Sequence, residues 1–151
     1  MVRGKRKTSV LIKPDGVVRA KIGKIISRFE EKGLKIVALK MIKVTREMAE
    51  KHYMVHKGKP FYESLLNYIT SGPVVAIVLE GKDAVEIARN LVGATNGAKA
   101  QPGTIRGDFA MSIDFNLVHA SDSDESASYE IPIFFRENEI LDYERSDRDW
   151  L

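Results

Sequence analysis

The apolar run VVAIVLEG, residues 74–81, limits the possible folds of this chain more than any other segment. A strand that is apolar on both faces must be covered on both faces, because a half-exposed strand alternates apolar with polar residues. The run therefore predicts a central strand in a sheet with packed layers around it. A chain of 151 residues can enclose such a core, and we expect residues 1–151 to form a single domain.

Other segments predict the remaining strands and the helices around them. β-branched and apolar residues predict strands over residues 8–13, 34–44 and 116–120. Apolar spacing and end signals predict helices over residues 21–33, 46–53, 60–72, 82–93 and 123–129. Thr45 is a suitable N-cap, Gly33 is a suitable helix stop, and the PDG sequence at 14–16 predicts a turn. The order of these elements predicts the ferredoxin-like βαββαβ plan, an α+β fold in which helices pack on an antiparallel sheet.

Residues 94–112, ATNGAKAQPGTIRGDFAMS, break the regular pattern of the chain. A loop of this length is uncommon in a compact domain and is usually functional. Thr95 and Arg106 lie in this loop, and Arg89 lies near the end of the helix expected before it. No neighbouring residue in the sequence obviously pairs with the guanidinium of Arg106. We therefore interpret the loop as part of a functional site.

The composition excludes several classes of protein. The chain has no cysteine, which rules out disulfides and thiolate-bound metals. Its 24 Lys and Arg against 21 Asp and Glu leave a net charge of +3, without the concentrated basic surface of a nucleic-acid binder. The phosphate-binding patterns G-x-x-x-x-G-K-[ST] and G-x-G-x-x-G are absent. No apolar run approaches the roughly 18 residues of a membrane span, and the N-terminal MVRGKRKT lacks the apolar core of a signal peptide. We expect a cytoplasmic protein that does not require nucleic acid or a membrane.

His119 lies where a short apolar run meets a series of serines and acids, NLVHASDSDESASYEI. Ser121, Asp122 and Ser123 are good N-cap residues, and Asp122 with Glu125 has the spacing of a capping box. By itself, the segment is explained by a helix start next to an ordinary histidine. The alternative is a nucleophilic imidazole.

Cationic and aromatic side chains elsewhere favour the nucleophilic alternative. Lys13 emerges at the end of the first predicted strand, and Tyr53 and Phe61 lie in or beside a connection rich in Lys, His and Gly. Together with the arginines and the hydroxyl of the long loop, they are the groups that phosphoryl transfer from a nucleotide needs. His52 and His56 have i, i+4 spacing, but the Glu of H-E-x-x-H and a third ligand are missing, which favours packing or surface roles over a metal site.

Five segments of the chain resemble the nucleoside diphosphate kinase family: LIKPDGV, HKGKPFY, GPVVAIVLEG, GATN…PGTIRGDF and NLVHASDSDESASYEI. They occur in the order of the family and extend over nearly the whole chain, from about Thr8 to Trp150. The resemblance implies a kinase with a ping-pong mechanism. In this mechanism His119 takes the γ-phosphate of a nucleoside triphosphate such as ATP or GTP, holds it as phosphohistidine, and passes it to a different nucleoside diphosphate. The resemblance also implies Mg²⁺ as cofactor, held mainly through the nucleotide phosphates.

The resemblance implies a role for each matching residue. Phe61 would stack on the base, and Lys13 and Asn116 would contact the sugar. The residues that would hold the phosphates are Arg89, Thr95 and Arg106, and those that would surround the histidine are Tyr53, Ser121 and Glu130. Glu130 would orient the imidazole and raise its pKa, whereas the arginines would lower it, and the sequence leaves that balance open. The structural alternatives are a core position for Phe61, a turn for Asn116, and hydrogen bonds within the loop for Thr95 and Arg106.

Two positions depart from the pattern of the family, and the end of the chain bears on its assembly. Gly97 stands where the family commonly has Pro, which predicts a more mobile loop, and Ala120 stands where many relatives have Gly. The tail EILDYERSDRDWL resembles that of hexameric rather than tetrameric members, and exposed Trp150 and Leu151 would be unusual in a monomer. We expect a homohexamer. Two other functions stay open, a non-catalytic module that binds nucleotide or RNA, and a relay that passes phosphate from His119 to another protein.

Overall fold

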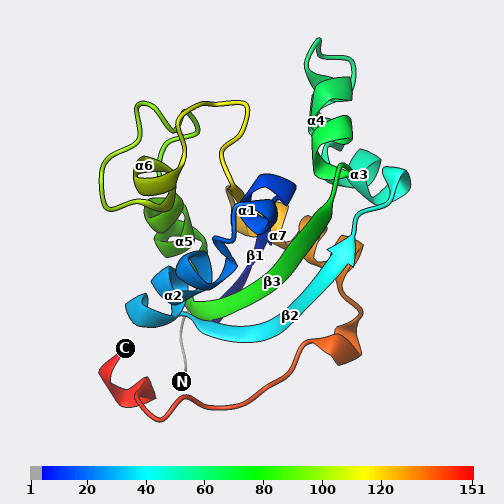
Figure 1. Cartoon of the computed structure of the whole chain (residues 1–151). Coiled ribbons are helices and arrows are strands. Elements are labelled where there is room, and N and C mark those ends of the chain that lie inside the picture. The colour runs from blue at the N-terminus through cyan, green and yellow to red at the C-terminus, as the bar shows by residue number, and fades with distance from the viewer. Residues whose placement is uncertain (1–4) are drawn as a thin grey trace.

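The computed structural model describes residues 5–151 and contains a four-stranded antiparallel sheet with helices packed around it (Figure 1). The strands are β1 (Lys5–Ile12), β2 (Lys35–Lys43), β3 (Pro73–Lys82) and β4 (Val118–Ala120). Their order in the sheet is β2-β3-β1-β4, and each neighbouring pair is antiparallel. The predicted ferredoxin-like α+β fold is confirmed. The first four residues of the basic N-terminal segment lie outside the described part of the chain.

Seven α-helices connect and cover the strands of the described chain: α1 (Pro14–Val18), α2 (Ile22–Lys32), α3 (Arg46–His52), α4 (Tyr62–Ile69), α5 (Ala84–Val92), α6 (Ile105–Phe109) and α7 (Asp124–Phe134). Short 3-10 turns follow at Met54–His56, Glu137–Glu139 and Arg148–Trp150. No helix within residues 5–151 combines the length and the apolar character needed to cross a membrane.

The sheet separates two apolar cores, as the apolar run in β3 predicts. Side chains alternate between the two faces along a strand, so Ile77 of β3 faces the core beneath α2 and α5, whereas Val78 faces the core beneath α3, α4 and α7. Both side chains are fully buried. Burying one such aliphatic side chain contributes about 1.5–3 kcal/mol, so the central strands hold both layers of helices in place.

Two local signals in the sequence act as expected. Gly33 ends α2 in the left-handed conformation, with φ of 114°, which glycine adopts without the steric cost of a Cβ. Thr45 caps α3, because its side-chain oxygen accepts a hydrogen bond of 3.1 Å from the backbone N–H of Met48. These residues fix the ends of the helices that flank β2.

The structure corrects four local predictions. The PDG segment begins helix α1 instead of forming a simple turn, since Pro14 occupies the first turn, where a missing N–H costs nothing. The helix expected from residue 60 begins at Tyr62, after Phe61 as N-cap. The loop at 94–112 contains helix α6.

The fourth correction concerns α7, which runs to Phe134 instead of ending near residue 129. Its buried residues Ala127, Glu130 and Phe134 form a helical stripe against the sheet, and this packing outweighs the unfavourable Pro132 inside the helix. Ser123 is the N-cap, in place of the capping box expected from Asp122: its hydroxyl accepts a hydrogen bond of 3.0 Å from the backbone N–H of Ser126.

Candidate active site

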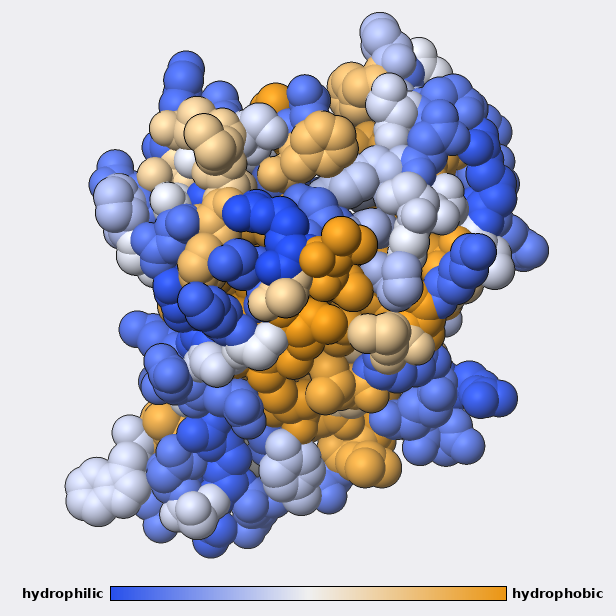
Figure 2. Space-filling view, viewed as in Figure 1, coloured by the Kyte–Doolittle hydropathy of each residue, from blue (hydrophilic) through white to orange (hydrophobic). Residues whose placement is uncertain are grey.

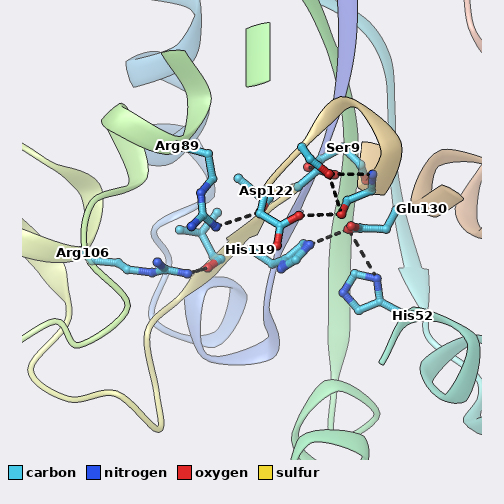
Figure 3. Close-up of polar contacts among 12 residues, drawn as sticks. Ser9, His52, Arg89, Arg106, His119, Asp122 and Glu130 are labelled. Atoms are coloured by element: carbon cyan, nitrogen blue, oxygen red, sulfur yellow. Dashed lines mark hydrogen bonds and ion pairs between the residues drawn. The ribbon is translucent and has the colours of Figure 1, made fainter. Parts of the chain in front are cut away.

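His119 projects from the short edge strand β4, which pairs with β1 and places His119 opposite Leu11. Its Nε2 lies 2.5 Å from the Oε1 atom of Glu130, which reaches it from α7 (Figure 3). A short contact of this kind to a carboxylate is a charge-assisted hydrogen bond, so Nε2 carries the proton and donates it. Nδ1 then holds the free lone pair, and it has no hydrogen-bond partner within residues 5–151. The side chain of His119 stays 24% exposed, so this nitrogen is open to a reactant.

His52, at the end of α3, lies directly beside this pair. Its ring packs edge-on against the ring of His119, with centroids 4.5 Å apart, and its Nδ1 is 3.6 Å from Oε1 of Glu130. Both ring nitrogens are buried and lack a hydrogen-bond partner in the described chain. Burial, with the nearby His119 as a second cause, lowers the pKa of His52 to about 3. Sequence reasoning missed His52, because it considered this residue only together with His56.

Lys13 and Asn116 meet at one side of the histidine. The Nζ atom of Lys13 donates a hydrogen bond of 2.9 Å to Oδ1 of Asn116, and Nδ2 of Asn116 donates one of 3.0 Å to the backbone carbonyl of Thr95. Burial, followed by the charge of Arg106, lowers the pKa of Lys13 to about 8. The fold therefore brings together three of the predicted residues, which come from the position just after β1, from the long loop and from the segment before β4.

Arg106 is buried, and its guanidinium finds its partners in the backbone. It donates to the carbonyl oxygens of Gly93 at 3.0 Å and Val118 at 2.7 Å, and more weakly to that of Asn116 at 3.4 Å. Burial and the charge of Arg89 lower the pKa of Arg106 to about 10, so the side chain remains cationic at neutral pH. Arg106 therefore does have the structural role named above as an alternative, because its hydrogen bonds connect the two ends of the long loop.

Burial and the neighbouring cations together set the charge state of His119. Burial is the main influence that lowers its pKa, and the charges of Lys13, Arg106 and Arg89 lower it further. Burial raises the pKa of Glu130. The balance that the sequence left open therefore favours a neutral imidazole at pH 7, which is the nucleophilic form.

The remaining predicted residues lie around this centre. Ser121 is buried after β4, and its hydroxyl donates to the carbonyl of Ser9 at 3.4 Å. Tyr53 is buried against the ring of His52, with centroids 4.6 Å apart, and burial raises the pKa of its hydroxyl. Phe61 is 46% exposed and packs edge-on against His56, so it is not the core residue of the structural alternative.

A series of rings connects Phe61 to the histidine on β4. His56 contacts Phe61 at 5.3 Å and Tyr53 at 6.3 Å between centroids, and Tyr53 contacts His52, which contacts His119. Phe61 therefore stands at the exposed end of a row of rings whose other end is the imidazole of His119.

A cavity of about 380 Å³ lies elsewhere, between the end of α2, the strands β2 and β3, and the C-terminal segment. It is lined by charged side chains such as Lys82 and Arg145 and by Leu151, and by none of the residues around His119. Size alone does not make it the active site, because the groups capable of nucleophilic chemistry are at β4.

On this antiparallel α+β fold a neutral histidine lies among lysine and arginine side chains, and these are the groups that a phosphotransferase needs. The family model for nucleoside diphosphate kinase matches residues 6–140. This chain belongs to the nucleoside diphosphate kinase family.

Relatives and solved structures agree with this assignment. The chain is 57% identical to a nucleoside diphosphate kinase of Archaeoglobus fulgidus over 96% of each protein, and 59% identical to one of Thermoplasma acidophilum over 93% of this chain and 95% of the relative. A halophilic nucleoside diphosphate kinase from Halobacterium salinarum in complex with CDP superposes with a TM-score of 0.94 at 44% identity, covering 97% of each chain. A transition state mimic of the enzyme from Borrelia burgdorferi, with vanadate and ADP bound, gives a TM-score of 0.90 at 42% identity over 95% of each chain.

Proposed function

We propose that this protein is a nucleoside diphosphate kinase that works through a phosphohistidine on His119. The observation that carries the proposal is the hydrogen bond of 2.5 Å between Nε2 and Glu130, which directs the lone pair of Nδ1 away from α7. An imidazole held in this way is both oriented and in the correct tautomer before the substrate arrives.

The chemistry requires no proton to leave the ring. The Nδ1 lone pair attacks the γ-phosphorus of the triphosphate, the bond from phosphorus to the β–γ bridging oxygen breaks, and the diphosphate departs. Positive charge that develops on the ring is balanced by Glu130 through Nε2–H. In the second half, a terminal oxygen of a different diphosphate attacks the phosphorus, the P–N bond breaks, and neutral His119 is restored.

The cationic groups around His119 suit the negative charge of the transferred phosphoryl group. We assign Arg89, Thr95 and Arg106 to the phosphates, and Lys13 and Asn116 to the sugar. The side chains assigned to the phosphates are cationic or neutral, so the nucleotide phosphates would supply most of the oxygen ligands for Mg²⁺. The carboxylate of Asp122 lies nearby, between Arg89 and His119 (Figure 3). When bound, Mg²⁺ would neutralise part of the phosphate charge.

Phe61 offers a half-exposed ring for the base. Every base has a π-face, so stacking tolerates all of them and fits a kinase that accepts several nucleoside triphosphates, including ATP and GTP. Tyr53 and Ser121 stabilise the surroundings of His119 without contacting the nucleotide. Tyr53 packs against His52, and Ser121 fixes the end of β4 to β1.

We also infer a homohexamer, because two separate apolar surfaces are exposed. Leu39 and Met41 are 51% and 58% exposed on β2, the edge strand of the sheet, and Figure 2 shows apolar surface across this face of the molecule. Met111, Ile113 and Phe115 are also exposed, at the end of the long loop and just after it. A self-complementary contact across a twofold axis, combined with a contact between two different patches around a threefold axis, generates a hexamer. We further infer that residues 1–151 form one domain and that the protein works in the cytoplasm.

The intact mass of the protein after incubation with Mg²⁺-ATP tests the proposal. Wild type should gain one phosphoryl group and lose it when a different nucleoside diphosphate is added, as the new triphosphate appears, and His119→Ala should gain none. If the protein is folded and binds nucleotide but its mass does not change, the protein is a non-catalytic binding module. A phosphorylated protein that fails to discharge to free diphosphates would instead indicate a relay to another protein.

A further inference from the structure

Three potential metal ligands converge at the active site from three different elements. His52 comes from α3, His119 from β4 and Glu130 from α7 (Figure 3). One donor atom from each side chain can be chosen so that all three lie within 4.8 Å of one another. Oε1 of Glu130 is the shared point, at 2.5 Å from Nε2 of His119 and 3.6 Å from Nδ1 of His52.

His52 is the unexplained member of this group. Its side chain is only 2% exposed, yet neither ring nitrogen has a hydrogen-bond partner in the described chain. Leaving a buried polar group unpaired costs about 1–3 kcal/mol, and the phosphoryl transfer proposed above uses neither nitrogen of His52. An apolar side chain of similar size would fill this space without that cost. The position of Nδ1, facing Glu130, therefore calls for a ligand.

We propose that His52, His119 and Glu130 form an inhibitory site for a divalent transition-metal ion such as Zn²⁺. Two imidazole nitrogens and one carboxylate, with a fourth position open to water, match the ligand set that Zn²⁺ takes in many proteins. Tetrahedral bonds of about 2.0–2.1 Å place neighbouring ligand atoms roughly 3.4 Å apart. The separations of 2.5 and 3.6 Å lie on either side of this value, so small side-chain movements close the site.

The same ligand set separates this ion from Mg²⁺. Mg²⁺ prefers six oxygen ligands in octahedral geometry, whereas imidazole suits Zn²⁺, Cu²⁺ and Ni²⁺. Low pKa values keep the rings of His52 and His119 neutral, so the metal need not displace a proton from an imidazolium. The positive charges of Lys13, Arg89 and Arg106 act against a cation, and the negative charge of Glu130 acts in its favour.

Inhibition follows from the tautomer of His119, and this part rests on the kinase function proposed above. A neutral imidazole has one nitrogen with a lone pair and one with a proton. A metal on Nε2 uses the lone pair there, and the proton moves to Nδ1. The nitrogen that should attack phosphorus then becomes an N–H, so the metal-bound enzyme cannot form phosphohistidine.

Metal binding is tested first, without nucleotide, by titrating the folded protein with Zn²⁺ in a calorimeter and with Co²⁺ in an absorption spectrometer. Wild type should bind one ion per chain, and Co²⁺ should show the intense visible bands of tetrahedral coordination. His52→Gln and His119→Gln should each weaken binding by roughly tenfold or more, since altering even an outer-sphere partner costs about that much. His56→Gln is the matched control, because this ring lies outside the group, and it should bind as wild type does. Binding that survives in folded His52→Gln, or a wild-type affinity weaker than about 1 mM, would overturn the proposal.

Inhibition is tested by the rate of phosphoenzyme formation from Mg²⁺-ATP, with free Zn²⁺ fixed by a metal buffer. Zn²⁺ should slow wild type and His56→Gln, whereas His52→Gln should need about tenfold more Zn²⁺ for the same effect. Zn²⁺ bound to the nucleotide affects all three proteins equally, so a difference between them belongs to this site. Equal inhibition of all three would refute the inhibitory role. Failure of the kinase proposal would show itself separately, as a wild type that is not phosphorylated even without Zn²⁺ while metal binding is still measured.

Discussion

Acid should destabilise this fold through His52, and His52→Gln should remove a defined part of that effect. In the unfolded chain the imidazole has a pKa of about 6.5, and in the fold burial lowers its pKa to about 3. Between these values the unfolded chain binds a proton that the folded chain does not. Stability is therefore complete above about pH 6.5 and falls as the pH is lowered toward the folded pKa.

The size of the effect follows from the pH interval. From about pH 6.5 to pH 5 is roughly 1.5 units, and each unit is worth ~1.36 kcal/mol, so His52 alone removes about 2 kcal/mol of unfolding free energy. A typical domain has only about 5–15 kcal/mol in total. His119 adds a loss of the same sign, because its pKa is also lowered in the fold.

Urea unfolding at pH 7 and at pH 5, at one protein concentration, measures the change for wild type and for His52→Gln. The absolute stability of the variant at pH 7 is not the readout, because Gln is also a buried polar residue. The readout is the loss between the two pH values, which should be about 2 kcal/mol smaller in the variant. His56 is only partly buried, so His56→Gln should change this loss less. An equal acid-induced loss in wild type and His52→Gln would show that His52 is not held neutral by burial.

Four further substitutions probe the site, the loop and helix α2. The pKa of Lys13 is lowered to about 8, so kcat/KM for the nucleotide should decline as the pH rises through 8. In Lys13→Arg, kcat/KM should stay constant to a higher pH. Identical pH profiles of the two proteins would exclude Lys13 as the titrating group. Glu130→Gln replaces the charged acceptor 2.5 Å from Nε2 of His119 by a neutral one. Charge-assisted hydrogen bonds are stronger by about 1–1.5 kcal/mol, so the variant should form phosphoenzyme about tenfold more slowly in rapid-quench experiments. An unchanged rate would refute the orienting role of Glu130. A Cβ at Gly97 would lie 2.4 Å from Cβ of Ala110, so Gly97→Ala should lower the stability measured by thermal unfolding by about 1–3 kcal/mol. Gly23 lies inside α2 and has nothing within 4 Å of an added Cβ, so Gly23→Ala should raise the stability by about 0.5–1 kcal/mol. Equal shifts in the two variants would contradict the close approach at Gly97.

The sequence predicts the parts of the fold that depend on short-range patterns. The uninterrupted apolar residues of β3, the left-handed Gly33 and the cap of Thr45 act through neighbours in the chain, and all three are found as expected. The PDG segment was misinterpreted because Pro14 suits both a turn and the first turn of a helix, and the segment is held by a residue far along the chain: the backbone N–H of Leu117 donates a hydrogen bond of 3.1 Å to the carboxylate of Asp15. Local patterns do not contain that contact.

The site shows the same division. His119 was recognised as a candidate from its surroundings, and the competing explanation is also true, because Ser123 caps α7 a few residues later. Arg106 could not be paired from sequence, since its partners are backbone carbonyls that a side-chain pattern does not display. His52 was missed because its position depends on how α3 packs beside α7. Residue spacing alone could have identified His52 only if the position of Glu130 beside α3 had been known.

The position of β4 in the sheet has a consequence for the synthesis of the protein. β4 is the last strand of the described chain, but it pairs with β1, the first. A nascent chain can pair β1 with β3 and bury much of both cores before β4 has left the ribosome. His119 gains its register opposite Leu11 only when β4 docks, and Glu130 arrives later still with α7. The nucleophile that we propose is therefore assembled only at the end of translation, and an incomplete chain that has already begun to fold lacks the oriented imidazole.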